Sequence, residues 1–140
     1  MESKDCLFCK IVAGTIPCYK VYEDEHVLAF LDLFPVMKGH TLMIPKKHFA
    51  QLHDISPEEA GNILSRLPKV GQAVKKGLKV DAYNVIQNNG KYAGQYIFHS
   101  HFHFLPRTEG DECIKWPESG PKLELDAAKP IIESIKSAFK

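Results

Sequence analysis

Apolar residues in the first third of the chain form short runs separated by polar or turn-forming residues. The run Val27–Asp32 is mostly apolar, and its length is typical of a buried strand. The run His40–Pro45 is similar and ends at a proline, whereas Phe34–Gly39 between them contains proline and glycine and should form a loop. Together with a short strand at Tyr19–Tyr22, these runs predict an antiparallel meander.

A helical pattern follows in the middle of the chain. Ser56 is a favourable N-cap, Pro57 suits the first helical position and Glu59 completes a capping box. Apolar residues then recur at spacings of three and four and predict one apolar stripe: Ala60, Ile63, Leu64, Leu67, Val70, Val74 and Leu78. A proline inside a helix costs about 3 kcal/mol, so we expect a kink or a break at Pro68.

The rest of the pattern adds two strands and a second helix. Ala82–Gln87 and Gln95–Leu105 are predicted as strands, with a loop rich in turn residues between them. Asp126–Phe139 is predicted as a terminal helix with one apolar face. We therefore predict an α+β fold in which a five-stranded antiparallel sheet packs against a central amphipathic helix, with a further helix at the C-terminus. No internal repeat is present, and residues 1–140 are expected to form a single domain.

Composition and charge are those of an ordinary globular domain. Hydrophobic residues make up 44% and charged residues 25% of the chain. The formal net charge is only +1, which does not favour a groove for long nucleic acid. The first residues lack the features of a signal peptide, and no apolar run approaches the roughly 18 residues of a membrane span. We expect no membrane partner and a cytoplasmic protein that could also enter the nucleus.

The unusual feature of the composition is its seven histidines, of which His99, His101 and His103 alternate with other residues. On a strand these three side chains would share one face, roughly 6.5 to 7 Å apart. Neutral imidazole is both a nucleophile and a base, with an ordinary pKa near 6.5. Three explanations are open: a surface strand that is rich in histidine, a metal site, or nucleophilic catalysis. No acidic residue lies between Asp81 and Glu109, which weakens the case for a metal-dependent hydrolase.

A second candidate site is the pair of cysteines in Cys6-x-x-Cys9. A redox pair would normally follow a strand, and nothing before Cys6 forms one. A disulfide is disfavoured in a reducing compartment. A zinc site needs two more ligands, for which His48 and His99 are candidates.

The motif His-x-His-x-His followed by Pro-Arg, with Asn-x-Gly and Ala-Gly-Gln before it, resembles the histidine triad (HIT) family of nucleotide-binding proteins. The resemblance includes the segments Leu7–Val12, Ile16–Pro17, Tyr22–Asp24, Ala29–Asp32 and Gly39–His48. It covers a core of about residues 6–107 and leaves residues 108–140 as a C-terminal extension. The most similar branch is that of the Hint-type purine nucleoside phosphoramidases. The resemblance implies a HIT-like fold and a homodimer.

The resemblance also implies a mechanism. His101 would attack the α-phosphate and form a covalent nucleotidyl-histidine intermediate, which water would hydrolyse. His103 would contact the phosphate and help to protonate the leaving group, and His40 would orient its neighbours. The substrate would be a purine nucleoside monophosphate joined to an amine such as lysine, and no cofactor would be required for the chemistry.

Further residues match the binding positions of the family. Asp32 would accept the ribose hydroxyls, since a carboxylate can accept two hydrogen bonds. The phosphate would meet Asn88 and the backbone and side chains of Gly94 and Gln95. The apolar positions that would hold the base are Leu7, Phe8, Ile11, Leu33 and Leu42. Tyr96 lies where the family often has serine or threonine, so the preferred leaving group stays open.

The resemblance implies a structural zinc as well. Some Hint-type proteins and the related galactose-phosphate uridylyltransferases bind zinc through Cys-x-x-Cys, a distant histidine and the first histidine of the triad. The corresponding residues are Cys6, Cys9, His48 and His99. Two alternative functions remain: a dinucleoside polyphosphate hydrolase of the fragile-histidine-triad type, and a nucleotide-binding adaptor with vestigial activity, which Tyr96 leaves open.

Overall fold

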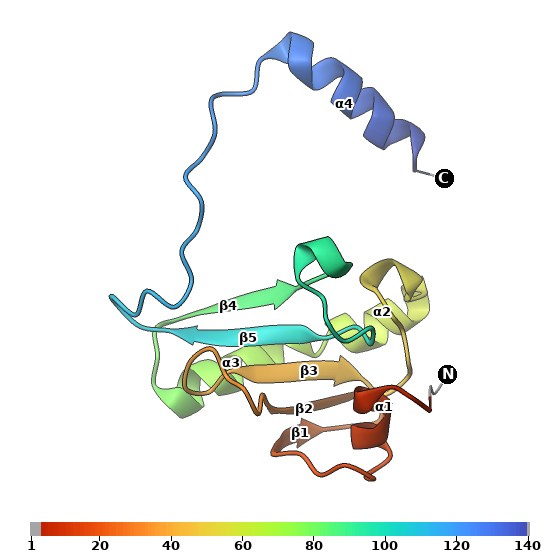
Figure 1. The fold of residues 1–140 in the computed structure, drawn as a ribbon, viewed down its shortest axis with the longest axis vertical. Helices are drawn as coiled ribbons and strands as arrows, with labels where there is room; N and C mark the ends of the chain where they lie inside the picture. Colours follow the sequence, from red (N-terminus) through yellow and green to blue (C-terminus); the bar gives the residue numbers. More distant parts are fainter. Residues whose placement is uncertain (1–3, 140) are drawn as a thin grey trace.

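A computed structural model describes residues 4–139, and its main body is one five-stranded sheet with helices on both faces (Figure 1). The strands are β1 (Lys20–Glu23), β2 (Val27–Leu31), β3 (Thr41–Pro45), β4 (Ala82–Gln87) and β5 (Phe102–Arg107). The α-helices are α1 (Leu7–Val12), α2 (Pro57–Leu64), α3 (Leu67–Leu78) and α4 (Leu125–Ser137), and 3-10 turns cover Leu52–Asp54 and Lys91–Ala93. The predicted α+β fold is confirmed. Within residues 4–139, no helix is long and apolar enough to span a membrane.

The sheet has the strand order β1-β2-β3-β5-β4, and every pairing in it is antiparallel. The prediction for β4 is confirmed residue for residue, whereas the strand predicted at Gln95–Leu105 is wrong in its first half. The β4 strand ends at Gln87, which pairs with Phe102, so residues 95–101 have no partner residues on β4. Consequently only His103 of the three alternating histidines lies on a strand, and they do not share one strand face.

The predicted break in the central helix is confirmed. Ser56 caps α2 by accepting a hydrogen bond from the Glu59 backbone, and α2 ends at Leu64. Pro68 lies in the first turn of α3, where its missing N–H costs nothing because that N–H would have no partner inside the helix. The apolar stripe therefore continues across two consecutive helices.

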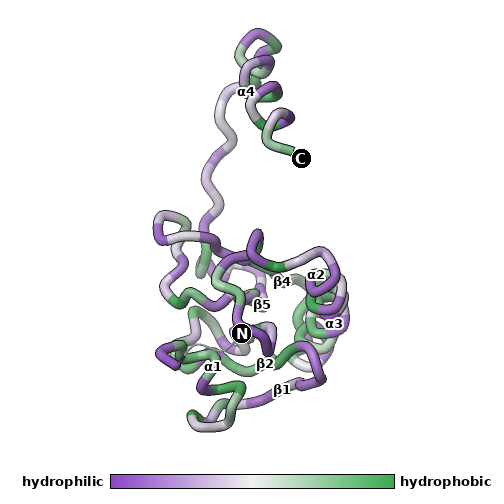
Figure 2. Tube along the Cα trace, turned by 90° about the vertical axis from the view of Figure 1, so that its right-hand side faces the viewer, coloured by the Kyte–Doolittle hydropathy of each residue, from purple (hydrophilic) through white to green (hydrophobic). Residues whose placement is uncertain are grey.

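Alternating side chains of the central strands build two cores, one on each face of the sheet. Val27, Ala29 and Met43 face α2 and α3, together with Phe102 and Phe104. The intervening residues face α1, where they form a second cluster of Phe8, Leu28, Phe30, Leu42 and Ile44. The sequence pattern did not predict α1. Figure 2 shows α1 and the α2–α3 pair on opposite sides of the sheet.

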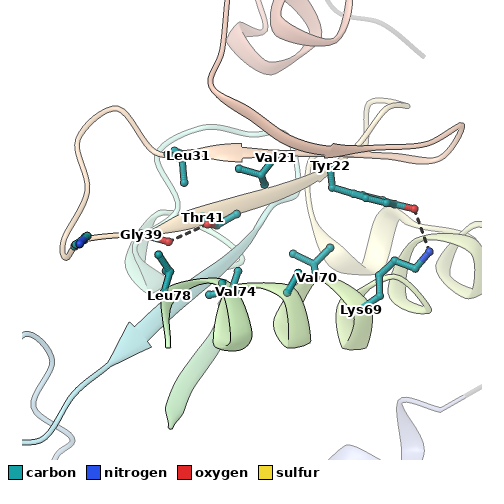
Figure 3. A pocket seen from close by; sticks show the side chains of 12 residues that line it. Val21, Tyr22, Leu31, Gly39, Thr41, Lys69, Val70, Val74 and Leu78 are labelled. Carbon is teal, nitrogen blue, oxygen red and sulfur yellow. Dashed lines mark hydrogen bonds between the residues drawn. The ribbon is translucent and has the colours of Figure 1, made fainter. Parts of the chain in front are cut away.

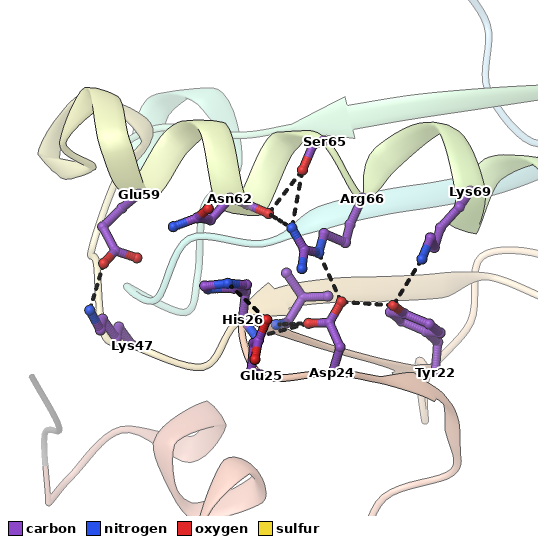
Figure 4. A network of polar contacts seen from close by, with 11 residues as sticks. Tyr22, Asp24, Glu25, His26, Lys47, Glu59, Asn62, Ser65, Arg66 and Lys69 are labelled. Atoms are coloured by element: carbon purple, nitrogen blue, oxygen red, sulfur yellow. Dashed lines mark hydrogen bonds and ion pairs between the residues drawn. The ribbon is translucent and has the colours of Figure 1, made fainter.

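A polar network fixes the β1–β2 turn to the junction of α2 and α3 (Figure 4). The Asp24 carboxylate accepts hydrogen bonds from the guanidinium of Arg66 at 2.8 Å and from the Tyr22 hydroxyl at 2.7 Å. It also accepts the backbone N–H groups of His26 and Val27. Burial alone would raise the pKa of Asp24, but these donors outweigh it and hold that pKa well below its usual range.

The C-terminal extension leaves the body after β5. Residues 108–124 form an irregular arm, and α4 lies beyond the β4 edge of the sheet, apart from the rest of the chain (Figures 1 and 2). The predicted terminal helix is confirmed, with slightly different ends.

Candidate active site

A cavity of about 550 Å³ lies between α1 and the face of the sheet formed by β2, β3 and β5. His40, His101 and His103 line it together with Asp32. All but one of the residues expected to bind a nucleotide line the same cavity: Leu7, Phe8, Ile11, Asp32, Leu33, Leu42, Asn88, Gly94 and Tyr96. The fold therefore brings together residues that are up to 96 positions apart in the sequence (Leu7 and His103).

The imidazole of His101 is held in one orientation by its own backbone neighbourhood. Its Nδ1 lies 2.7 Å from the carbonyl oxygen of His99. Because a carbonyl can only accept, Nδ1 carries the hydrogen, and the lone pair of the neutral ring is on Nε2. The edge of the Phe8 ring packs against the imidazole at a centroid distance of 5.1 Å. Burial lowers the pKa of His101, which keeps this nucleophilic nitrogen unprotonated near neutral pH.

His40 and His103 form a second pair of defined tautomers. The backbone N–H of Val36 donates to Nδ1 of His40 at 3.2 Å, so the hydrogen of His40 is on Nε2. That nitrogen lies 2.9 Å from Nδ1 of His103 and donates to it. Because Nδ1 of His103 accepts this hydrogen bond, the single N–H of its neutral ring is on Nε2, which is a hydrogen-bond donor toward the cavity.

Burial keeps this pair uncharged as well. Burial, followed by the neighbouring His101 and His40, lowers the pKa of His103 to about 4. Burial also lowers the pKa of His40, against the opposing effect of Asp32, whose Oδ2 lies 3.7 Å from His40 Nε2. Since Nε2 of His40 carries a hydrogen, Asp32, His40 and His103 do not present three free lone pairs to a metal ion.

Gln95 is the exception among the expected binding residues. Its side chain is only 1% exposed and does not line the cavity. Its amide oxygen accepts from Gly90 N–H at 2.8 Å, and its amide nitrogen donates to the carbonyls of Ala50 and Ile97. The expected contact of this side chain with the phosphate is therefore corrected: Gln95 shapes the loop that places Asn88 and Gly94 at the cavity wall.

A second cluster of side chains lies at the N-terminus of α1. The sulfur or Nδ1 atoms of Cys6, Cys9, His48 and His99 all lie within 4.8 Å of one another. Nδ1 of His99 is 3.3 Å from Cys6 Sγ, and Nδ1 of His48 is 3.3 Å from Cys9 Sγ. Around a tetrahedral zinc ion a sulfur and a nitrogen ligand are about 3.6 Å apart, so the four donors fit that ion.

The outer nitrogen of His99 completes the arrangement. Nε2 of His99 donates to the carbonyl oxygen of Pro45 at 2.8 Å, which leaves Nδ1 as the free donor atom facing the thiols. A histidine ligand oriented by a backbone carbonyl is typical of protein metal sites. Cys6 and Cys9 are thiols and form no disulfide.

Comparison with known proteins places the chain in a family. Residues 13–110 match the HIT domain. The chain belongs to the histidine triad family. It is 50% identical over 132 residues to an uncharacterised HIT-like protein of Methanocaldococcus jannaschii, covering 94% of this chain and 98% of that protein. It is 42% identical to the adenosine 5′-monophosphoramidase of Schizosaccharomyces pombe, covering 96% of this chain and 98% of that enzyme.

A solved structure agrees with this assignment. A crystal structure from Streptococcus mutans has 42% sequence identity and a TM-score of 0.94, covering 99% of this chain and 88% of that one. An adenylylsulfatase of Arabidopsis thaliana that carries the Hint name is 44% identical, covering 89% of this chain and 65% of that protein. The predicted Hint-type branch of the HIT family is thus confirmed.

Several parts of the HIT site were not predicted from the sequence. The cavity is also lined by Ile16, Pro17 and Cys18, to which the sequence analysis gives no role in binding. The Ile-Pro pair belongs to the motifs that carry the family resemblance, so it was an available signal. The backbone groups of Val36, Pro45 and His99 that set the tautomers have no signal in the sequence, because any residue supplies them.

Proposed function

We propose that this HIT protein hydrolyses purine nucleoside phosphoramidates of the AMP-amine type through a nucleotidyl intermediate on His101. The observation that carries the proposal is the hydrogen bond from His101 to the His99 carbonyl, because it leaves Nε2 of a buried, neutral imidazole as a nucleophile in a nucleotide-sized cavity. The name of the Schizosaccharomyces pombe relative, a monophosphoramidase, supports the substrate class.

In the first step, Nε2 of His101 attacks phosphorus, a nitrogen–phosphorus bond forms to the imidazole, and the bond to the amine breaks. The modified ring becomes cationic, and the His99 carbonyl on Nδ1–H stabilises that charge. The donor Nε2–H of His103 suits a phosphoryl oxygen on which negative charge grows. With a pKa lowered to about 4, His103 is a neutral hydrogen-bond donor in the free protein. In place of the expected protonation by His103, we propose that the departing amine takes up its proton from water. In the second step, water attacks phosphorus and releases AMP and neutral His101.

The nucleoside would extend along the cavity from the histidines toward α1. Oδ1 of Asp32 accepts from Phe34 N–H at 2.8 Å, which fixes the carboxylate and leaves Oδ2 for the ribose hydroxyls. The base would lie among the apolar side chains of α1 and of Leu33 and Leu42. Tyr96 is 88% exposed at the cavity lining and would face the leaving group.

The test is a mass spectrum of protein quenched during turnover of adenosine phosphoramidate. The quench should be an alkaline denaturant, because the bond from phosphorus to imidazole hydrolyses in acid. We expect AMP on the peptide that contains His101, and loss of turnover in His101→Ala. His53→Ala, which changes an exposed histidine, should keep full activity. Near-normal turnover by His101→Ala would contradict the assignment of the nucleophile.

Relative rates on different substrates separate the proposed function from the two alternative functions. Initial rates should be compared for adenosine phosphoramidate, AMP-lysine, a diadenosine polyphosphate and adenylyl sulfate. The proposal requires the phosphorus–nitrogen substrates to have the highest kcat/KM. A preference for the diadenosine compound would favour the fragile-histidine-triad function, and binding of AMP with no turnover of any substrate would favour an adaptor.

We also propose that Cys6, Cys9, His48 and His99 bind a structural zinc ion. The convergence of two cysteine sulfurs and two imidazole nitrogens, together with the His99–Pro45 hydrogen bond, supports it. The ion would link α1 to the segment that carries the nucleophile and would take no part in the reaction steps. Elemental analysis of purified protein should give one zinc per chain and none in Cys9→Ser. Thiolate ligands must remain reduced, which favours a reducing compartment such as the cytoplasm.

We further propose a homodimer in which a second copy adjoins the β4 edge of the sheet. β4 pairs with β5 on one side, and the sheet order leaves its other side as an edge. Unpaired backbone groups on an edge strand favour pairing with another chain. Val85 on this strand is also exposed. Sedimentation velocity should give twice the 15.8 kDa mass of the chain, and a monomer at micromolar concentration would contradict the proposal.

A further inference from the structure

A second cavity lies on the face of the sheet opposite the candidate active site, between the strands β1 and β2 and the helix α3 (Figure 3). We call it the α3 cavity. Val21 and Leu31 project into it from the sheet, toward Val74 and Leu78 of α3. Its volume is about 550 Å³. This is within the range of about 300–1,000 Å³ that is typical of small-molecule sites.

The α3 cavity exists because α3 packs unevenly on the sheet. On the side of β4 the contact is close, since a Cβ added to Gly71 would lie 2.6 Å from the hydroxyl oxygen of Tyr83. On the side of β1 and β2, the small residues Ala73 and Gly77 line the cavity. A Cβ added to Gly77 would meet nothing within 4 Å. A larger side chain at Gly77 would therefore enter open space.

The walls of the cavity are apolar and accessible from solvent. Val21 is 53% exposed and Leu31 is 36% exposed, whereas Val70 and Val74 behind them are buried. Water in contact with such walls is released when an apolar group takes its place, and this release favours binding. The apolar walls therefore suit a ligand with an apolar body.

Both charged side chains that line the α3 cavity are lysines, Lys38 and Lys69. Lys69 lies in the first turn of α3. Lys38 adjoins Gly39, where an added Cβ would overlap the side chain of Leu78, the last residue of that helix. From Lys69 to Leu78 the helix rises about 14 Å. The cavity thus has an apolar middle with a lysine at each end.

Neither lysine has a carboxylate partner among the described residues. Nζ of Lys69 donates to the Tyr22 hydroxyl at 3.2 Å, and that hydroxyl donates to Asp24. The carboxylate of Asp24 is paired with Arg66. An apolar space with unpaired ammonium groups at its ends complements a molecule with an apolar body and an anionic head.

The α3 cavity is separate from the nucleotide site and from the proposed dimer interface. Among the described residues, Leu31 alone lines both cavities. β1 and β4 are the opposite edges of the sheet, and the second copy is proposed to adjoin β4. A ligand between β1, β2 and α3 could therefore bind together with a nucleotide and in the dimer.

We propose that the α3 cavity is a second ligand site that binds an amphipathic carboxylate, such as a medium-chain fatty acid. The apolar chain lies between the sheet and α3, and the carboxylate pairs with a lysine at the end of the cavity. The site contains none of the histidines of the candidate active site. The inference therefore stands or falls independently of the proposed catalytic function.

Isothermal titration calorimetry of the full chain with sodium decanoate tests the proposal. We expect saturable binding, and several-fold weaker binding of decyltrimethylammonium, a cation with the same apolar chain. Lys38→Met combined with Lys69→Met should weaken decanoate binding several-fold, because both ammonium groups are lost. The matched control is Lys75→Met combined with Lys76→Met, which removes the same charge from exposed positions of α3 outside the cavity and should leave the affinity unchanged.

A substitution that fills the cavity tests its position. The side chain in Gly77→Leu would occupy part of the space, and the open surroundings of its Cβ allow the helix to form. We expect loss of decanoate binding with no fall in the unfolding temperature. Gly61→Leu in α2, where an added Cβ also meets nothing within 4 Å, is the control and should bind decanoate like the unchanged chain.

The outcomes separate this inference from the proposed function. Decanoate binding that persists at saturating AMP supports the α3 cavity, whereas displacement by AMP places decanoate in the candidate active site and overturns the inference. Absence of decanoate binding, equal binding of the cation, or full binding by Gly77→Leu also overturns it. A chain that does not bind AMP contradicts the proposed function, and the lysine and Gly77 variants still decide whether the second site exists.

Discussion

Four histidine side chains carry their hydrogens on different ring nitrogens because each ring meets a different hydrogen-bonding partner. Carbonyl oxygens of His99 and Pro45 hold hydrogens on Nδ1 of His101 and on Nε2 of His99, respectively. The N–H of Val36 reverses the tautomer in His40. In the proposed function, His101 would thereby be the nucleophile and His99 a metal ligand, while His40 and His103 form a chain of hydrogen-bond donors.

The first prediction at this scale concerns the pH dependence of the reaction. Burial lowers the pKa of His101 below the ordinary imidazole value of 6.5, so its lone pair stays free as the pH falls through 6.5. The acid limb of kcat/KM should therefore have its midpoint below 6.5. His53→Ala should not move it. A midpoint at or above 6.5 would show that a solvated histidine controls the rate.

The second prediction concerns Asp24. The substitution Asp24→Asn removes the ion pair with Arg66. It also places the NH₂ group of an amide among groups that donate hydrogen bonds to the carboxylate, such as the Tyr22 hydroxyl. A lost hydrogen bond to a charged group costs about 1.5–3 kcal/mol, so the free energy of unfolding should fall by about this amount in urea titrations. Glu25→Gln, an exposed neighbour, is the control and should change it little. If Asp24→Asn and Glu25→Gln changed the free energy of unfolding equally, the polar network in Figure 4 would contribute no net stability.

Single elements are positioned by a few special backbone sites. The loop before β3 turns at Gly39, where φ is +85°, and an added Cβ would overlap the Leu78 side chain of α3. This turn places His40 at the start of the strand. The left-handed conformation of Gly39 therefore links the packing of α3 to the position of His40 in the candidate active site.

The third prediction tests that link. Gly39→Ala should lower the free energy of unfolding by about 1–3 kcal/mol, because the strained φ and the overlap with Leu78 add. Gly61→Ala in α2, where the added Cβ meets nothing within 4 Å, should instead stabilise the protein by about 0.5–1 kcal/mol. Urea unfolding of both variants is the measurement. A neutral Gly39→Ala would show that the loop can rearrange.

On the scale of the whole molecule, the proposed zinc site joins elements that the sheet does not hold together. α1 packs on the face of the sheet opposite α2 and α3, and the cluster of Cys6, Cys9, His48 and His99 links its N-terminus to two distant loops. The loop that contributes His99 to this cluster also carries His101. Stability and active-site geometry are therefore expected to depend on one cluster.

The fourth prediction follows from this connection. Removing zinc with a chelator should lower the unfolding temperature, because binding free energy of a structural metal is folding free energy. Activity of the protein that is still folded should decline only as unfolding begins. Scanning calorimetry with and without chelator measures the first effect, and Cys113→Ser should respond like the unchanged chain. An unaltered unfolding temperature would argue against a structural ion.

The sequence alone determined the features that depend on local pattern. The strand β4, the N-cap Ser56 before α2 and the proline that separates α2 from α3 can all be predicted from a few neighbouring residues, because propensity and hydrophobic periodicity act locally. The motif around His101 also sufficed to identify the HIT family.

Tertiary structure alone decided what depends on contacts between distant segments. Residues 95–101 were predicted as a strand, but β4 ends before they could pair, and the buried Gln95 side chain binds three backbone groups instead of facing a phosphate. The helix α1 and the tautomers likewise follow from contacts between distant segments. Backbone hydrogen bonds are made by every residue type, so their partners are fixed only when the chain has folded.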